Sequence, residues 1–325
     1  MNVSSLPGAK PNVLISRQAL SEYSMPLAYV VLFAVLAATV DNFFSVTNIV
    51  GLMLSVAQIG MVACTMMFCL ASRDFDLSVG STIAFAGVLG AIVLEHSGSV
   101  WLAVGAGLGA GALIGALNGV LIAYLRVNAL IATLATMLMV RGLAFIVSQG
   151  QAVGINDDAF IDFGDTRIFG LPLPVLVAAS CFAVFGVLLN QTVFGRNTLA
   201  IGGNPEAARL AGVRVERLRV WIFLLQGLVT AMAGLILASR ITSGQPNAAQ
   251  GFELDVISAC VLGGVSLAGG KARIFGVLIG VLIMGTVENV MNLMDVDAFY
   301  QYLMRGVILL LAVLLDQLKS RSERR

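Results

Sequence analysis

The chain has 325 residues, of which 58% are hydrophobic and only 11% are charged, and its formal net charge is +1. A soluble domain carries roughly 25% charged residues, and the apolar runs along the whole chain exclude a soluble core. The balanced charge gives no indication of nucleic-acid binding, and 35 glycines are typical of closely packed membrane helices. The sequence predicts an all-α, polytopic protein embedded in the lipid bilayer.

Ten apolar segments approach the length of about 20 residues that a helix needs to cross a bilayer. They lie at 26–44, 49–70, 79–95, 100–125, 129–148, 171–190, 220–240, 253–268, 274–294 and 298–316. Several are short or interrupted by glycine, so eight or nine complete spans remain an alternative. We therefore divide the chain into an N-terminal segment (1–25), a transmembrane domain (26–316) and a basic tail (317–325).

The lysines and arginines predict the orientation. If both termini are cytoplasmic, 15 of the 19 basic residues fall on the cytoplasmic side, as the positive-inside rule requires. Acidic residues instead collect in the opposite loop, 149–170. The first 25 residues lack the features of a cleavable signal peptide, so we expect an uncleaved first span in the inner membrane.

The two halves of the chain resemble each other weakly. The stretch from Gly111 to Leu117 resembles that from Gly276 to Leu282, and Arg141 then matches Arg305. With ten spans the partners would be five apart, which reverses their direction. The pattern predicts an inverted 5+5 repeat with broken helices, a recurring transporter design. Chance similarity between glycine-rich apolar segments is the alternative.

Two groups of residues indicate packing and a pathway. One group repeats every fourth residue and would form a smooth helix face for a close helix neighbour: Gly107, Gly111, Gly115 and Gly119. The other group is polar or charged within apolar surroundings, where such side chains line a cavity, form a gate or pair structurally. Its members are Asp74, Asp76, Ser78, Arg141, Glu288 and Arg305. Asp76 or Ser78 could also cap the helix that follows, and Glu288 could pair with Arg141 or Arg305.

The loop at 191–219 is the most informative segment. Asn204 is a good N-cap, Pro205 suits the first helical position, and Glu206 complements the helix dipole. Gly212 can end the helix in a left-handed conformation. A short helix at 205–211, in the inner loop richest in arginine, indicates a docking element for a soluble partner, and a plain surface loop is the alternative. The candidate docking residues are Asn204, Pro205, Glu206, Ala207, Ala208, Arg209 and Gly212.

No catalytic set or metal-ligand spacing is recognisable, so we expect neither an enzyme nor a metal site. The stretch from Gly264 to Lys271 has the wrong spacing for a phosphate-binding loop, and Ala272 replaces the required Ser or Thr. We expect no cofactor on this chain. If ATP drives the process, a separate chain must bind it.

Several motifs, taken together, carry a resemblance. The pattern Glu206-Ala207-Ala208-x-x-x-Gly212 resembles the Glu-Ala-Ala loop of binding-protein-dependent permeases. In their order and spacing, four stretches across residues 25–317 resemble the ribose/xylose/arabinose/galactoside permease family: Phe75–Gly80, Gly202–Asn204, Val261–Gly264 and Ser266–Gly270. Three further stretches resemble the arabinose branch of that family: Phe68–Ser72, Gly195–Ala200 and Gly285–Asn289. Arg73 and Ala272 depart from the pattern, since each stands where glycine is common.

The resemblance implies an importer that carries a monosaccharide, most closely a pentose, across the bacterial inner membrane. It implies two copies of the permease, a cytoplasmic ATP-binding-cassette ATPase and a periplasmic sugar-binding protein. Two other interpretations stay open at this point. One is an ion-coupled secondary transporter, for which Glu288 is the only deep carboxylate, and the other is the same class of importer with a non-sugar cargo.

Overall fold

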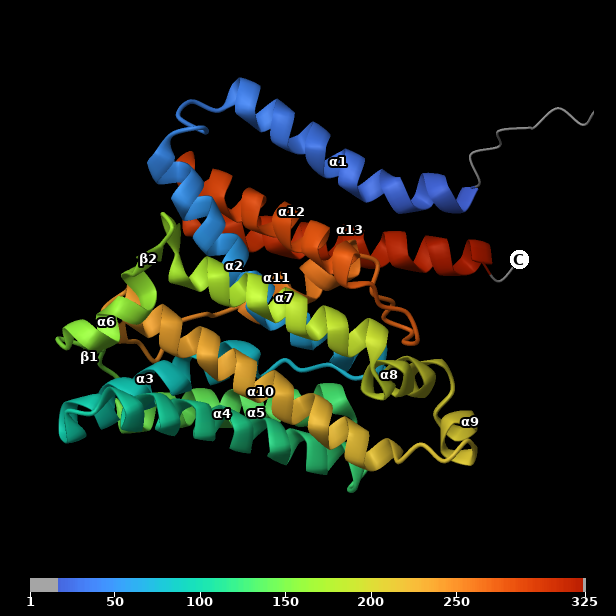
Figure 1. Ribbon diagram of the computed structural model, residues 1–325, viewed down its shortest axis with the longest axis horizontal. Helices are drawn as coiled ribbons and strands as arrows, with labels where there is room; N and C mark the ends of the chain where they lie inside the picture. Colours follow the sequence, from blue (N-terminus) through green and yellow to red (C-terminus); the bar gives the residue numbers. More distant parts are fainter. Residues whose placement is uncertain (1–16, 324–325) are drawn as a thin grey trace, which may run out of the picture.

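The computed structural model describes residues 17–323, which are mostly helical (Figure 1). Seven of the described helices are long and apolar enough to cross a membrane. These are α2 (Val46–Ala71), α3 (Val79–Ser97), α4 (Val100–Ala123), α5 (Ala129–Val147), α7 (Leu173–Gln191), α10 (Val215–Arg240) and α12 (Ile274–Leu293). The remaining helices are α1 (Arg17–Thr39), α6 (Asp158–Asp165), α8 (Val193–Gly203), α9 (Pro205–Leu210), α11 (Phe252–Leu262) and α13 (Ala298–Glu323).

Four two-residue strands form two small antiparallel pairs. In the first pair β1 (Val153–Gly154) lies against β4 (Ser243–Gly244), and in the second β2 (Arg167–Ile168) lies against β3 (Leu171–Pro172). Strands β1 and β2 lie with α6 in the 149–170 segment, for which the sequence predicted only a loop.

The structure differs from the prediction of ten full spans. Helices α1 and α13 contain apolar stretches of only Met25–Thr39 and Ala298–Leu314. The segment 253–268 is not one helix, because α11 ends at Leu262 and Gly264 takes a positive φ of 82°. That left-handed conformation cannot continue an α-helix, so the apolar run breaks there.

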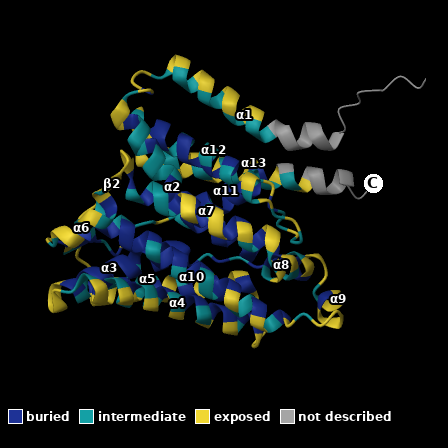
Figure 2. Cartoon of the chain, viewed as in Figure 1, coloured by how far each residue is buried: buried dark blue, intermediate teal, exposed yellow. Residues whose placement is uncertain are grey.

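The helices pack around two long, central ones. Helix α2 packs against α7, α11 and α12, while α10 packs against α3 and α4. Figure 2 shows the buried residues concentrated in the middle of this bundle, with exposed residues on α1 and on the outer faces of α4 and α5. Every residue from Ala57 to Ala71 on α2 is buried, so this helix forms much of the core.

The four regularly spaced glycines of α4 face α10. A Cβ built at Gly111 or Gly115 would collide with the backbone carbonyl of Gly227 or Phe223 on α10, and one at Gly119 would lie 2.7 Å from the Cα of Val220. Only hydrogen fits between the two backbones at these points. Gly107 approaches a side chain, that of Leu235, instead of the backbone.

Helices α2 and α10 run in opposite directions. The end of α2 lies beside α8, since a Cβ on Gly202 would overlap the carbonyl of Ala71, and α10 begins shortly after α9. The end of α10 lies beside α6, where Ser239 Oγ donates to the carbonyls of Phe160 and Ile161. Helices α9 and α6 therefore mark opposite ends of the bundle (Figure 1).

Candidate functional site

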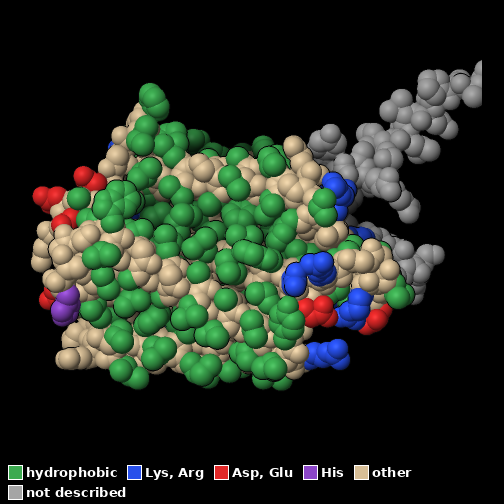
Figure 3. Space-filling model, turned by 60° about the horizontal axis from the view of Figure 1, so that its bottom comes forward, with side chains coloured by type: hydrophobic (Ala, Val, Ile, Leu, Met, Phe, Trp, Pro, Cys, Tyr) green, Lys and Arg blue, Asp and Glu red, His purple; other side chains and the backbone are tan. Residues whose placement is uncertain are grey.

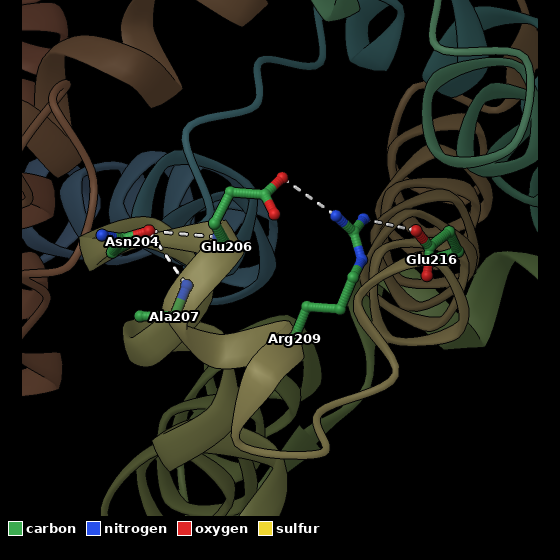
Figure 4. Close-up of polar contacts among 5 residues, drawn as sticks. All are labelled: Asn204, Glu206, Ala207, Arg209 and Glu216. Atoms are coloured by element: carbon green, nitrogen blue, oxygen red, sulfur yellow. Dashed lines mark hydrogen bonds and ion pairs between the residues drawn. The ribbon is translucent and has the colours of Figure 1, made fainter.

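Helix α9 stands outside the bundle as a separate, capped element. It begins at Pro205, and Asn204 Oδ1 accepts hydrogen bonds at 3.1 Å from the amides of Glu206 and Ala207 (Figure 4). Gly212 follows with a φ of 88°. The predicted cap and left-handed end are therefore confirmed, and the helix proper ends at Leu210, one residue earlier than expected.

Arg209 connects α9 to the start of α10. Its guanidinium donates to Glu206 at 3.0 Å and to Glu216 at 2.6 Å, and Figure 4 shows it between the two carboxylates. Because these groups are largely exposed, the pairs add little stability. They connect the side chains of α9 to the first turn of α10. Leu210 at the end of α9 is 89% exposed.

Two glycine pairs meet beneath the end of α2. The amide of Gly270 donates to the carbonyl of Ala71 at 2.9 Å, and Gly202 lies so close to Ala71 that no Cβ would fit. Arg73 reaches across to donate to the carbonyl of Gly203 at 2.8 Å. Arg73 itself has a φ of 67°, a left-handed conformation that favours glycine. The junction links α2, α8 and the 263–273 segment.

The link between α2 and α3 holds an ion pair. Arg219 Nε lies 3.0 Å from Asp74 Oδ2, at an angle too bent for a hydrogen bond. Burial raises the pKa of Asp74 to about 6, while Arg219 and the hydroxyl of Ser72 favour its charged form. The contact ties this link to the first turn and a half of α10.

Asp76 and Ser78 do not cap α3 as we expected. Ser78 N and Oγ instead donate to Asp76 Oδ1 at 2.9 and 2.6 Å, so the carboxylate is bound by the N-cap residue itself and not by the free amides of the helix. Burial raises the pKa of Asp76, and the two hydrogen bonds from Ser78 oppose that rise. Asn118 of α4 donates to Ser78 Oγ at 3.0 Å and accepts from Thr136 of α5 at 2.6 Å.

A second polar network joins α11, α12 and α13. Arg305 lies 3.3 Å from Asp255 and 3.5 Å from Glu288, and its guanidinium is also 5.8 Å from the ring centre of Tyr302. Charges this deep in an apolar bundle require such partners. Of the two predicted pairings for Glu288, the structure contains the one with Arg305. Arg141 donates instead to the carbonyls of Pro246 and Ala248, at 2.8 and 2.7 Å.

Several members of these networks were not predicted from the sequence. Asn118, Thr136, Arg219 and Asp255 each lie in or beside an apolar run, and that isolation was the available signal. Helix α8 was not predicted either, and its N-cap Thr192 accepts from the amide of Gly195 at 3.4 Å. The bundle of long apolar helices, with buried polar networks inside and a capped helix outside, defines a multi-pass membrane protein.

Comparison with known proteins identifies the family. Residues 48–313 match the family described as the permease component of branched-chain amino acid transport systems. The L-arabinose transport system permease AraH of Escherichia coli K12 is 57% identical, over 93% of this chain and 92% of its own. AraH of Azospirillum brasilense is 53% identical over 95% and 91%, and the ribose import permease RbsC of Bacillus subtilis is 43% identical over 90% and 92%. No solved structure matches the chain.

The chain belongs to this family of transport-system permeases, and it is a transport subunit rather than an enzyme. The resemblance to the ribose/xylose/arabinose/galactoside permeases is confirmed by the identity to both arabinose and ribose permeases across nearly the whole chain.

Proposed function

We propose that this chain is the permease subunit of an ATP-binding-cassette importer that carries L-arabinose, or a related pentose, across the bacterial inner membrane. The observation that carries the proposal is 57% identity to an L-arabinose permease over 93% of the chain. Identity to a ribose permease is lower, at 43%. The family description names branched-chain amino acids, whereas the relatives reported above are named for arabinose and ribose.

Three protein partners complete the importer. Two copies of this permease form the pathway, a periplasmic sugar-binding protein delivers cargo, and a cytoplasmic ATPase binds and hydrolyses the ATP. Helix α9 and the rest of the 191–219 loop form the docking element for the ATPase. The supporting features are the cap at Asn204, the exposed Leu210 and the brace through Arg209 to Glu216. Nucleic acid has no role.

Both termini lie in the cytoplasm, and the α9 end of the bundle is the cytoplasmic end. The basic side chains on the visible face gather at that end together with a few acidic ones, whereas mainly acidic side chains lie at the opposite end, with a mostly hydrophobic surface between them (Figure 3). This arrangement follows the positive-inside rule. The ten spans are completed by α1, α13 and the broken segment around α11.

The second half of the transmembrane domain is an inverted repeat of the first. Helices α2 and α10 run in opposite directions, and each packs against helices of the other half of the chain. Helix α2 packs against α11 and α12, and α10 packs against α3 and α4. The sequence repeat supports the same relation, since it pairs Gly111 with Gly276 and Arg141 with Arg305 at nearly the same interval.

The two polar networks form the translocation pathway and its gates. Sugars are recognised through hydroxyl groups, for which carboxylates, amides and guanidinium groups supply donors and acceptors. Asp74, Asp76 and Ser78 belong to a link that leaves α2 at the cytoplasmic end, whereas Glu288 lies near the opposite end of α12. Arg141 holds the 241–251 segment in place. Opening at either end would require these contacts to exchange partners.

Uptake of labelled L-arabinose tests the proposal, in cells whose only arabinose importer is this permease with its two protein partners. Uptake should be inhibited by excess unlabelled L-arabinose and little by leucine. It should persist with a protonophore while ATP is maintained, and it should stop when ATP is depleted. Collapse of uptake by the protonophore at constant ATP would support the ion-coupled alternative, and inhibition by leucine but not arabinose would support an amino acid cargo.

A further inference from the structure

A basic cleft opens beside the proposed docking helix, at the α9 end of the bundle. Its volume is about 600 Å³, and it lies between the end of α4 and the connection from α9 to α10. The lining residues are Ala123, Tyr124, Arg126, Arg209, Gly212, Val213, Arg214, Glu216 and Arg217.

The cleft carries excess positive charge. Four arginines line it against one carboxylate, that of Glu216, which is already paired with Arg209 at 2.6 Å. Arg126, Arg214 and Arg217 form no ion pair within 4.0 Å among the described residues, and all three are exposed. Helix α10 also begins here, and its cap residue, Arg214, offers no side-chain acceptor to the first amides. The Glu216 carboxylate in the first turn offsets the helix dipole, so the excess positive charge of the cleft comes from the arginines.

Apolar surface leads directly to this cleft. On α4, four side chains at helical spacing form an exposed stripe that ends at the cleft, with exposures of 62%, 54%, 41% and 54%: Leu113, Leu117, Val120 and Tyr124. On α10, Trp221 is 57% exposed and lies one turn beyond Arg217, on the same helix face. Tyrosine and tryptophan at this depth are typical of the boundary between lipid headgroups and acyl chains.

We propose that the cleft binds the headgroup phosphate of an anionic phospholipid, whose acyl chains lie along the exposed stripe of α4. Guanidinium groups bind phosphate through paired, charge-assisted hydrogen bonds, and a hydrophobic path below such a cluster suits a lipid better than a soluble anion. A lipid there would touch both α4 and the segment that holds α9. Its binding does not depend on which cargo the permease carries.

The two tryptophans allow a direct test, because Trp101 and Trp221 lie on helices α4 and α10, at opposite ends of the bundle. The full-length Trp101→Phe permease, with Trp221 as its reporter, is reconstituted in phosphatidylcholine bilayers. Quenching is then measured with phosphatidylglycerol or phosphatidylcholine brominated near the ester end of the chains. Half-maximal quenching should require an about fivefold lower mole fraction of brominated phosphatidylglycerol than of brominated phosphatidylcholine. This ratio corresponds to the binding free energy of roughly one arginine–headgroup contact.

In the Arg214→Gln/Arg217→Gln variant the preference for phosphatidylglycerol should disappear, so that the two lipids quench at about equal mole fractions. The preference should persist in Arg196→Gln, which removes an exposed arginine outside the cleft. Unchanged quenching by brominated phosphatidylcholine in each variant would indicate an intact fold. The matched Trp221→Phe permease, which reports from Trp101, should have no preference for phosphatidylglycerol.

Four results would overturn the proposal. The first is equal quenching by the two lipids, or a preference that survives loss of both arginines. The second is abolition of the preference by millimolar inorganic phosphate, which would indicate a soluble-anion site. The third is a Trp221 that neither lipid quenches, which would place a second copy of the chain on this face. The fourth is loss of ATPase co-purification in the double variant with the lipid preference intact, which would assign the arginines to the protein partner.

Discussion

The charged side chains of the second polar network depend on one another. Arg305 lies between Asp255 and Glu288, whose side chains are 6% and 30% exposed. Each carboxylate loses most of its hydration in the fold, and Arg305 provides the only cation within 4.0 Å of either among the described residues. Removing one member of such a buried ion pair destabilises the fold strongly, whereas removing both members together destabilises it much less.

This dependence predicts an ordered series of stabilities. Arg305→Gln should destabilise the permease by about 3 kcal/mol, because it leaves two carboxylates without a cation. Glu288→Gln should cost less, since Asp255 still pairs with Arg305. Thermal denaturation of the purified permease in detergent would give the order.

A double variant provides the internal control. Arg305→Gln combined with Asp255→Asn should be more stable than Arg305→Gln alone, so the two changes should not be additive. Equal melting temperatures for Arg305→Gln and Glu288→Gln, or simple additivity in the double variant, would contradict a shared ion pair at this site.

At the scale of elements, the contact between α4 and α10 allows a matched comparison on a single helix. A leucine at Gly111 would drive its Cβ into Ala231 and the carbonyl of Gly227, whereas Gly109 has no atom within 4 Å of its Cβ position. Gly111→Leu should therefore cost about 3 kcal/mol or more and reduce the yield of monodisperse permease, while Gly109→Leu should behave like the unaltered chain.

Yield and size-exclusion profile in detergent would measure both variants. A well-folded Gly111→Leu permease, or an equal loss with Gly109→Leu, would mean that close backbone contact between α4 and α10 is not required.

Features set by neighbouring residues in the chain were predictable from the sequence, whereas features set by distant residues were not. The cap of α9 was predictable, because Asn204, Pro205 and the following amides are neighbours in the chain. The apolar runs predicted the long helices for the same reason. The sequence predicted that some spans are broken but not that the break follows α11, since an apolar run containing glycine can continue as a helix or end in a left-handed turn. The contact of Ser78 with Asn118 depends on tertiary packing, and no local pattern specifies it.

At the scale of the whole molecule, α9 should transmit the movement of the ATPase. Glu206→Ala with Gly212→Val removes the acid at the helix start and puts a β-branched residue where φ is 88°. The variant should insert in the membrane normally, but cargo uptake, stimulated ATP hydrolysis and co-purification of the ATPase should all fall several-fold. The sugar-binding protein should still bind its sugar, because it is a separate chain.

Gly150→Val is the matched control for backbone strain. Gly150 also has a positive φ, of 75°, and no atom lies within 4 Å of its Cβ position, but it follows α5 and lies far from α9. ATPase association should survive this change. If the α9 variant retains full association and uptake, or if Gly150→Val disrupts association equally, α9 is not the docking element.

The orientation of the whole chain determines which partner meets which end, and the native cysteines make it easy to measure. All four, Cys64, Cys69, Cys181 and Cys260, are free and buried, so a cysteine introduced at the surface should label over a low background. We expect an impermeant maleimide to label Asp158→Cys, in exposed α6, in intact cells. Ser4→Cys, which lies outside the described residues, and Ser322→Cys should label only after the membrane is permeabilised. Labelling of either terminal cysteine in intact cells would place that terminus in the periplasm and would remove α9 from reach of a cytoplasmic ATPase.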